Sequence, residues 1–360
     1  MSTGPLTDLT VIEFAGLGPA PYAAMLLADM GATVIRIERP DAQPASAAAI
    51  SQRGRAQRYA ADLKNPDDLA CVRSLVGDAD ALIEGFRPGT MERLGLGPEA
   101  LLKENPRLVY GRVTGWGQTG PLKSTAGHDI NFIAVTGALA AIGPRHRPVL
   151  PLNLIGDFAG GSMFLVSGML AALMAARRTG QGQVVDAAMC DGVISLMTAI
   201  HEQVADGQWT ERRESNIFDG GLPHYRSYEC ADGKHISIGP LEEPFYVRLC
   251  EAIGLVPPPQ RDAPSHWPAL RASFEQIFKT RTRDEWATLL ESGEHCLSPV
   301  LGVSEAPLHH HLAARGSFID VGGVVQAGPV PRFSKHGTQP SAGVRDPVPI
   351  AHAMASKVAG

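Results

Sequence analysis

The chain has 360 residues, of which 44% are hydrophobic, and its 37 acidic and 32 basic residues give a formal net charge of −5. This length and composition can bury the cores of two domains, which excludes a disordered protein. Because basic residues are not in surplus, we expect no nucleic-acid binding.

The sequence also bears on compartment and membrane contact. Five cysteines at wide spacing, with no CxxC pair, argue against a disulfide framework and fit a reducing compartment. Residues 1–5 lack the basic and apolar segments of a signal peptide. The longest apolar stretch, residues 163–176, is shorter than a bilayer requires and predicts a buried helix. We therefore expect a cytoplasmic protein that does not contact a membrane.

From the N-terminus onward, apolar runs and turn residues predict alternating strands and helices. The expected elements are a strand at 11–14, a helix at 21–30, a strand at 33–37, a helix at 66–76, and strands at 81–84, 108–113 and 184–186. Strands that alternate with helices form a mostly parallel sheet covered on both faces. The predicted fold class is therefore α/β, with a large domain built on a Rossmann-like, doubly wound parallel sheet.

The second half of the chain has a different pattern. Two alternating runs, 225–230 and 235–238, flank Asp232-Gly233, which is typical of a β-hairpin, and helices at 244–253 and 267–278 follow. We predict a large domain at 1–205, a linker at 206–224 and a smaller α+β domain at 225–316. A tail rich in Pro and Gly, at 317–360, would return over the surface of the large domain.

Several residues just past the predicted strands suggest a ligand. Residues 16–21 form a glycine-containing turn, but a dinucleotide fingerprint needs Gly or Ala where Pro21 stands, so we favour an ordinary tight turn over nicotinamide binding. Arg39, Lys64 and Arg87 each follow a predicted strand. Cations at that sheet edge suit a phosphorylated ligand, although each by itself is typical of a solvated surface charge.

Two residues are candidates for acid/base chemistry. His128 lies in a Gly-His-Asp sequence, and Asp157 precedes the apolar helix. An imidazole and a carboxylate suit proton transfer near neutral pH. The alternatives are a structural histidine and a helix N-cap worth about 1 kcal/mol, whose neighbouring amides could also receive an oxyanion. Glu242 by itself is an ordinary acid at a helix start.

A run of three histidines at 309–311, with His295 and Cys296 nearby, raises the question of a metal site. Consecutive histidines cannot all face one ion, and no spaced pair of ligands accompanies them. We therefore expect no bound metal.

Short motifs in a characteristic order lie at residues 11–13, 16–19, 31–40, 61–64, 84–89, 114–118, 127–131, 156–157 and 182–186. Together they resemble the α-methylacyl-CoA racemases of the class III CoA-transferase superfamily. The resemblance implies that Asp157 stands where the transferases have the nucleophile that forms acyl anhydrides. It further implies that His128 is the histidine added in the racemases, and that Glu242 supports it.

The same resemblance implies a mode of substrate binding. Arg39, Lys64 and Arg87 would bind the phosphates of CoA, and the backbone around Ala61 and Leu63 would hold its adenine. The resemblance also implies an interlocked homodimer, in which Glu242 and the small domain of one subunit complete the site of the other.

Our hypothesis is an isomerase that epimerises (2R)- and (2S)-2-methylacyl-CoA thioesters. His128 would remove the α-proton, Asp157 would protonate the opposite face, and backbone N–H groups at Asp157 would hold the enolate oxygen. CoA is then part of the substrate, and no redox or metal cofactor is expected. The alternatives are a CoA-transferase with Asp157 as nucleophile, a non-catalytic CoA-binding module and a nicotinamide oxidoreductase.

Overall fold

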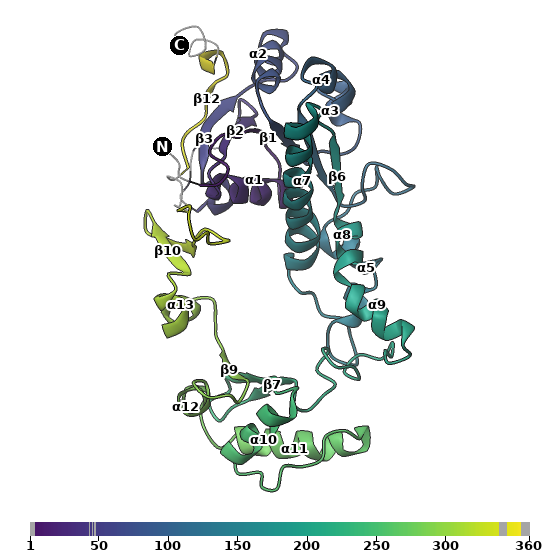
Figure 1. Ribbon diagram of the computed structural model, residues 1–360, viewed down its shortest axis with the longest axis vertical. Coiled ribbons are helices and arrows are strands. Elements are labelled where there is room, and N and C mark those ends of the chain that lie inside the picture. The colour runs from purple at the N-terminus through teal and green to yellow at the C-terminus, as the bar shows by residue number, and fades with distance from the viewer. Residues whose placement is uncertain (1–3, 43, 45, 47, 338–343, 354–360) are drawn as a thin grey trace. The chain divides into compact units, whose positions relative to one another are not determined.

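The computed structural model describes residues 4–42, 44, 46, 48–337 and 344–353, and Figure 1 shows its elements. The chain forms two compact units. The first contains Met1–Ala138, Pro151–Met197 and His311–Gly360, and the second contains Leu139–Leu150 and Thr198–His310.

The elements of the first unit are β1 (Thr10–Phe14), α1 (Pro19–Asp29), β2 (Thr33–Glu38), η1 (Ile50–Gln52), β3 (Arg55–Ala60), α2 (Pro66–Gly77), β4 (Ala81–Glu84), α3 (Thr90–Arg93), α4 (Pro98–Glu104), β5 (Val109–Thr114), α5 (Asp129–Ala134), η2 (Leu154–Met163), α7 (Phe164–Thr179), β6 (Val184–Ala188), α8 (Met189–Leu196), β10 (Phe318–Val321), β11 (Val324–Ala327) and β12 (Val348–Pro349). Two short helices, α6 (Ala138–Ala141) and α13 (His310–Ala314), cross from one unit into the other along the chain.

In the described part of the chain, seven parallel strands form one sheet in the order β12-β3-β2-β1-β4-β5-β6. The chain begins in the middle with β1, builds outward through β2 and β3, and then crosses to β4 on the other side. This arrangement confirms the predicted α/β fold class with a doubly wound sheet. Between β1 and β4 the winding direction reverses, which is where ligands bind in such sheets.

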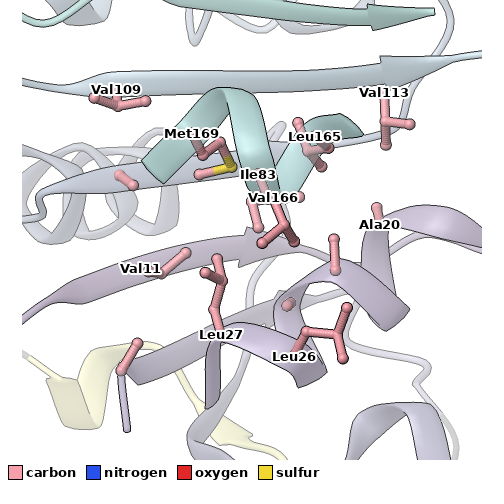
Figure 2. Packing of buried hydrophobic residues seen from close by; sticks show 14 of the residues in the cluster. Val11, Ala20, Leu26, Leu27, Ile83, Val109, Val113, Leu165, Val166 and Met169 are labelled. Carbon is pink, nitrogen blue, oxygen red and sulfur yellow. The ribbon is translucent and has the colours of Figure 1, made fainter. Parts of the chain in front are cut away.

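Two hydrophobic layers cover the two faces of this sheet, because neighbouring residues of a strand point to opposite faces. Val11 belongs to the layer formed with α1 and α7, whereas Ile12 belongs to the layer formed with α2 and α4. Figure 2 shows the first layer, in which Val11 of the sheet lies near Leu27 of α1, and Val109 lies near Met169 of α7. The carboxyl ends of the strands are therefore held rigidly.

The sequence analysis missed β3, because this strand carries charged residues that are buried. Arg55 Nε donates to Glu13 Oε2 at 2.7 Å, Arg58 Nη2 donates to Glu38 Oε2 at 2.7 Å, and Arg36 pairs with both glutamates. All five side chains are buried. Burying an unpaired charge costs several kcal/mol, so these arginines of β2 and β3 require the glutamates of β1 and β2 as partners.

The apolar helix is longer than predicted. A π-helical segment, η2, continues into α7, so the helix runs from Leu154 to Thr179 rather than over 163–176. By length and composition alone, this 26-residue helix could cross a membrane. However, α7 packs on β5 and β6 and buries Leu165, Met169 and Leu173 in the core, as a central helix of a globular domain does.

The tail belongs to the first unit and contains regular structure. It forms the antiparallel hairpin β10–β11, and β12 joins the edge of the large sheet beside β3. Arg58 donates to the carbonyl of Arg345 at 2.6 Å, which helps to attach this part of the tail.

The elements of the second unit are α9 (Thr198–Ala205), β7 (Arg226–Glu229), β8 (His235–Ile238), α10 (Glu243–Ala252), η3 (Pro264–His266), α11 (Trp267–Phe278), α12 (Arg283–Leu290), β9 (Leu297–Val300) and η4 (Ala306–Leu308). The predicted hairpin pairs β7 with β8 in antiparallel register, and β9 adds a third strand. Helices α10, α11 and α12 bury their apolar faces against this sheet around Phe274 and Trp286. This is the expected α+β architecture.

Candidate active site

A cavity of about 290 Å³ lies at the carboxyl ends of β1, β4 and β5. Gly18 lines it after β1, Arg87 after β4 and Trp116 after β5, and His128 and Asp157 line it as well. The cavity therefore occupies the point where the winding of the sheet reverses. The structure brings the two predicted acid/base residues into one cavity, which the sequence could only suggest.

His128 is the residue that directly precedes α5. Its main-chain N–H donates to Oδ1 of Asn131 at 3.0 Å, which closes the start of the helix. Phe132 in the first turn is buried, and its ring packs edge-on against Trp116 with centroids 4.9 Å apart. The backbone of His128 is thus fixed. Its imidazole is exposed, and the residue lines the cavity.

Asp157 does not cap a helix, and the N-cap interpretation of this residue is wrong. It is the fourth residue of η2, whose N-cap position is Asn153. Asn153 Nδ2 donates to Oδ2 of Asp157 at 3.0 Å. The same carboxylate lies over Gly18, where a Cβ atom would be 3.2 Å from Oδ2 and φ is +64°. π-Helical turns occur frequently at functional sites, because the extra residue displaces a side chain from the regular helical position.

Asp129 is a residue of this site that the sequence analysis did not select. Its side chain is buried, and Oδ2 accepts the main-chain N–H of Asp157 at 2.7 Å. Burial raises the pKa of the Asp129 carboxyl, and the nearby charge of Asp157 raises it further, whereas the main-chain hydrogen bonds from Asp157 and Gly156 oppose this shift. The only signal in the sequence was a second acid directly after His128.

This contact corrects the predicted role of the Asp157 amide. We expected that amide to receive the enolate oxygen, but it donates to Asp129 instead. Gly156 makes the close approach possible, because a Cβ there would lie 2.4 Å from Oδ2 of Asp129. Asp129 therefore ties the chain at Asp157 to the start of α5, where His128 is located.

A second cavity, of about 1090 Å³, extends along the carboxyl ends of β1, β2 and β3. It is lined by four of the predicted CoA-binding residues, Arg39, Ala61, Leu63 and Lys64. Arg87 lines the smaller cavity with His128 and Asp157 instead. Leu17 and Phe86 line both cavities, so the two adjoin one another.

The groups available to a ligand in the larger cavity match an anionic nucleotide. Arg39 and Lys64 are exposed, and neither forms an ion pair within the described residues. Asp62 uses its amide to bind the side chain of Asp68 and its carbonyl to bind Asn65. In the described part of the chain, the main-chain groups of Leu63 make no hydrogen bond, so they can bind a base.

Glu242 belongs to the second unit, where it occupies the N-cap position of α10. It is exposed and makes no side-chain capping hydrogen bond. Burial raises the pKa of the neighbouring Cys296 thiol, and the charge of Glu242 raises it further. Among the described residues, the one group of three possible metal ligands also lies in this unit and contains Glu291, His309 and His310.

Comparison with known proteins gives consistent results. The sequence model of CoA-transferase family III matches residues 6–351. The chain is 41% identical over 318 residues to alpha-methylacyl-CoA racemase of Homo sapiens, covering 87% of this chain and 82% of that protein. Identity to the Mus musculus alpha-methylacyl-CoA racemase is 38% over 346 residues, covering 95% of this chain and 90% of that protein. A crystal structure of a CAIB/BAIF family protein from Brucella suis matches with a TM-score of 0.82 at 26% identity, covering 99% of this chain and all of that one.

Proposed function

The chain belongs to CoA-transferase family III, and on this premise we propose that it is an isomerase that interconverts the (2R) and (2S) epimers of 2-methylacyl-CoA thioesters. The observation that carries the proposal is that His128 and Asp157 line the same cavity. A thioester acidifies its α-hydrogen, and a positioned base contributes roughly 10²- to 10⁴-fold to its removal. Two acid/base groups around one α-carbon are sufficient for a 1,1-proton transfer.

In the proposed reaction, His128 takes the α-proton of one epimer and Asp157 protonates the enolate from the other face. The roles are exchanged for the other epimer. Because the Asp157 amide is bound to Asp129, the enolate oxygen must be stabilised by other groups of the cavity. The reaction moves only protons, so we propose that it requires neither a redox cofactor nor a metal.

The CoA moiety would extend through the larger cavity. Arg39 and Lys64 are proposed to bind phosphate groups there, and the backbone at Ala61 and Leu63 to bind the adenine. Arg87 would contact the part of the substrate nearest to the thioester, because it lines the smaller cavity. This proposal assigns Arg87 to another part of the substrate than Arg39 and Lys64, whereas the resemblance implied that all three bind phosphates.

Three further points complete the proposal. Glu242 is proposed to orient His128 and stabilise its charged form, in a homodimer whose subunits complete each other's sites. The described cysteines are all free thiols, which fits a reducing cytoplasm. Because Glu242 is proposed to stabilise the charged form of His128, Glu242→Gln should lower the rate of α-proton exchange. Because the subunits are proposed to complete each other's sites, size measurement in solution should give a dimer.

The test uses a single (2R)-2-methylacyl-CoA in D₂O without any acceptor acid. The wild type should incorporate deuterium at the α-carbon and form both epimers. His128→Gln and Asp157→Asn should each reduce epimerisation by about 10²-fold or more. The control His146→Ala, which changes an exposed histidine outside both cavities, should keep full activity.

A CoA-transferase is the rival function, with Asp157 as the nucleophile. It would leave the single epimer unchanged, yet exchange CoA with an added carboxylic acid through an anhydride. That result with the wild type, or full epimerisation by His128→Gln, would overturn the proposal.

A further inference from the structure

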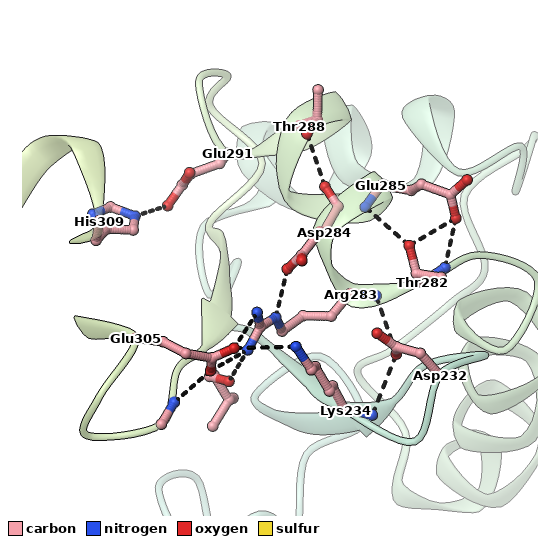
Figure 3. A network of polar contacts seen from close by, with 12 residues as sticks. Asp232, Lys234, Thr282, Arg283, Asp284, Glu285, Thr288, Glu291, Glu305 and His309 are labelled. Atoms are coloured by element: carbon pink, nitrogen blue, oxygen red, sulfur yellow. Dashed lines mark hydrogen bonds and ion pairs between the residues drawn. The ribbon is translucent and has the colours of Figure 1, made fainter. Parts of the chain in front are cut away.

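Three possible metal ligands lie close together in the second unit. None of the three lines either of the two cavities described above. Glu291 follows the last turn of α12, His309 follows η4, and His310 is the first residue of α13. Glu291 Oε1 lies 2.7 Å from Nε2 of His309, and Oε2 lies 3.9 Å from Nδ1 of His310. Figure 3 shows the imidazole of His309 directed at Glu291.

The two histidine rings lie side by side, with centroids 4.6 Å apart and planes inclined by 34°. The side chains of Glu291 and His309 are 23% and 17% exposed, whereas His310 is 79% exposed, so the group is open on one side only. Nδ1 of His309 is buried without a hydrogen-bond partner among the described residues. Nε2, the ring nitrogen that faces Glu291, therefore makes the one hydrogen bond of this ring among the described residues.

The segment that carries these histidines is held to α12 at both ends. Arg283, the first residue of α12, donates to Oε2 of Glu305 at 2.7 Å, and Glu305 precedes η4. Glu305 also binds Lys234 and the main-chain N–H of Gly302. At the other end of α12, Glu291 meets His309 (Figure 3). The ligand atoms are therefore positioned by a fixed framework, which reduces the cost of ordering them around an ion.

We propose that Glu291, His309 and His310 form a binding site for one divalent transition-metal ion of the zinc type. The three ligand atoms lie within 4.8 Å of one another. A tetrahedral zinc ion about 2.1 Å from each donor holds the donors about 3.4 Å apart, so side-chain shifts of about 1 Å close the site. The ion replaces the hydrogen bond between Glu291 and His309, and His309 binds it as a neutral ring that keeps its one proton on Nδ1, so that the lone pair of Nε2 is available to the ion.

The donor set selects the class of ion. Two imidazole nitrogens and one carboxylate oxygen suit Zn²⁺, Co²⁺, Ni²⁺ or Cu²⁺, whereas Mg²⁺ and Ca²⁺ prefer oxygen ligands throughout. The exposed side of His310 leaves a fourth position for water. The sequence argument against a metal was that consecutive histidines cannot all face one ion and that no spaced pair of ligands accompanies them. The fold supplies the missing ligand, because Glu291 lies 18 residues before His309 in the chain and next to it in space.

The proposed ion does not take part in proton transfer at the thioester, so this inference is independent of the proposed function. An ion that binds the folded chain and not the unfolded chain raises the unfolding free energy by mass action. The ion would join the end of α12 to the segment that leads out of the second unit at His310.

The test uses the full chain without a histidine tag, stripped of metal with a chelator and titrated with Zn²⁺ by calorimetry. We expect one ion per chain. Glu291→Gln and His309→Ala should each weaken Zn²⁺ binding at least about tenfold, since even loss of a group outside the coordination sphere has that effect. The matched control is His311→Ala, which shortens the histidine run but leaves the proposed ligands, and it should bind as the wild type does.

Co²⁺ absorption identifies the ligands separately. A four-coordinate site of nitrogen and oxygen donors should give visible bands without a sulfur-to-cobalt charge-transfer band. Circular dichroism should show that each variant is folded. Binding that survives Glu291→Gln but is lost with His311→Ala would mean that the histidine run alone binds the ion, and a charge-transfer band would mean that a cysteine is a ligand. Either result, or no binding to the wild type, overturns the proposal.

Discussion

The contact between Asp129 and Asp157 gives the sharpest prediction, and Asp129→Ala is the change that tests it. The buried carboxylate accepts the N–H of Asp157 at 2.7 Å, and a hydrogen bond to a charged group contributes about 1.5–3 kcal/mol. The burial that raises the pKa of Asp129 opposes part of this gain. We therefore expect Asp129→Ala to lower the unfolding free energy by about 1–3 kcal/mol.

The same change should impair catalysis, because Asp129 fixes the backbone that carries Asp157. A misplacement of about 1 Å in a catalytic group costs roughly 10²-fold in rate. We expect kcat for α-proton exchange to fall by that factor, while KM changes little because the cations of the larger cavity are untouched. Asp129→Asn keeps the shape and one acceptor oxygen, so it should restore most of the stability and part of kcat.

The pH dependence of stability identifies the charge itself. Because the pKa of Asp129 is raised in the folded state, the folded protein binds more protons than the unfolded chain between the ordinary value of 3.8 and the raised value. The contribution of Asp129 to the unfolding free energy therefore falls as the pH rises through this window. Asn cannot titrate, so the stability of Asp129→Asn relative to wild type should increase over the same window.

Urea denaturation at several pH values measures stability, and deuterium exchange followed by NMR measures kcat and KM. Unchanged denaturation midpoints together with unchanged kcat in Asp129→Ala would show that this hydrogen bond does not position Asp157. A relative stability of Asp129→Asn that stays constant with pH would contradict the assignment of the raised pKa.

Three more predictions concern stability and substrate binding. The hydrogen bond from Arg283 holds the pKa of Glu305 below its ordinary value of 4.5, so Glu305→Gln should lower stability near pH 7. That difference from wild type should disappear as the pH falls below 4.5 through the lower folded pKa, and a difference that persists in acid would refute it. Gly192→Ala should cost about 1–3 kcal/mol in urea denaturation, because its Cβ would lie 2.0 Å from a main-chain oxygen of η2. Gly77→Ala, which meets no atom within 4 Å, should be tolerated, and equal effects would rule out the packing argument. Arg39→Ala should raise KM for the CoA thioester with little change in kcat, in a manner that weakens at high salt; a loss of kcat alone would place Arg39 elsewhere.

The sequence by itself determined most strands of the large sheet and the sheet edge at which the two cavities lie. Periodic apolar runs such as residues 81–84, which form β4 as predicted, are local signals, because alternation and helical spacing depend only on near neighbours in the chain. Short motifs after the strands then identified the sheet edge, where Arg39 and Lys64 line one cavity and His128 and Asp157 line the next.

Only the tertiary structure decided the partners of the charged and polar groups. Asp129 meets the amide of Asp157 across 28 residues, and Glu291 meets His309 across 18. Nothing in the local pattern specifies such pairs, because a carboxylate in sequence is compatible with solvent, with a cap or with a distant donor. Burial removes the solvent alternative, and the packed fold then leaves each group only the partner that it brings within hydrogen-bond distance.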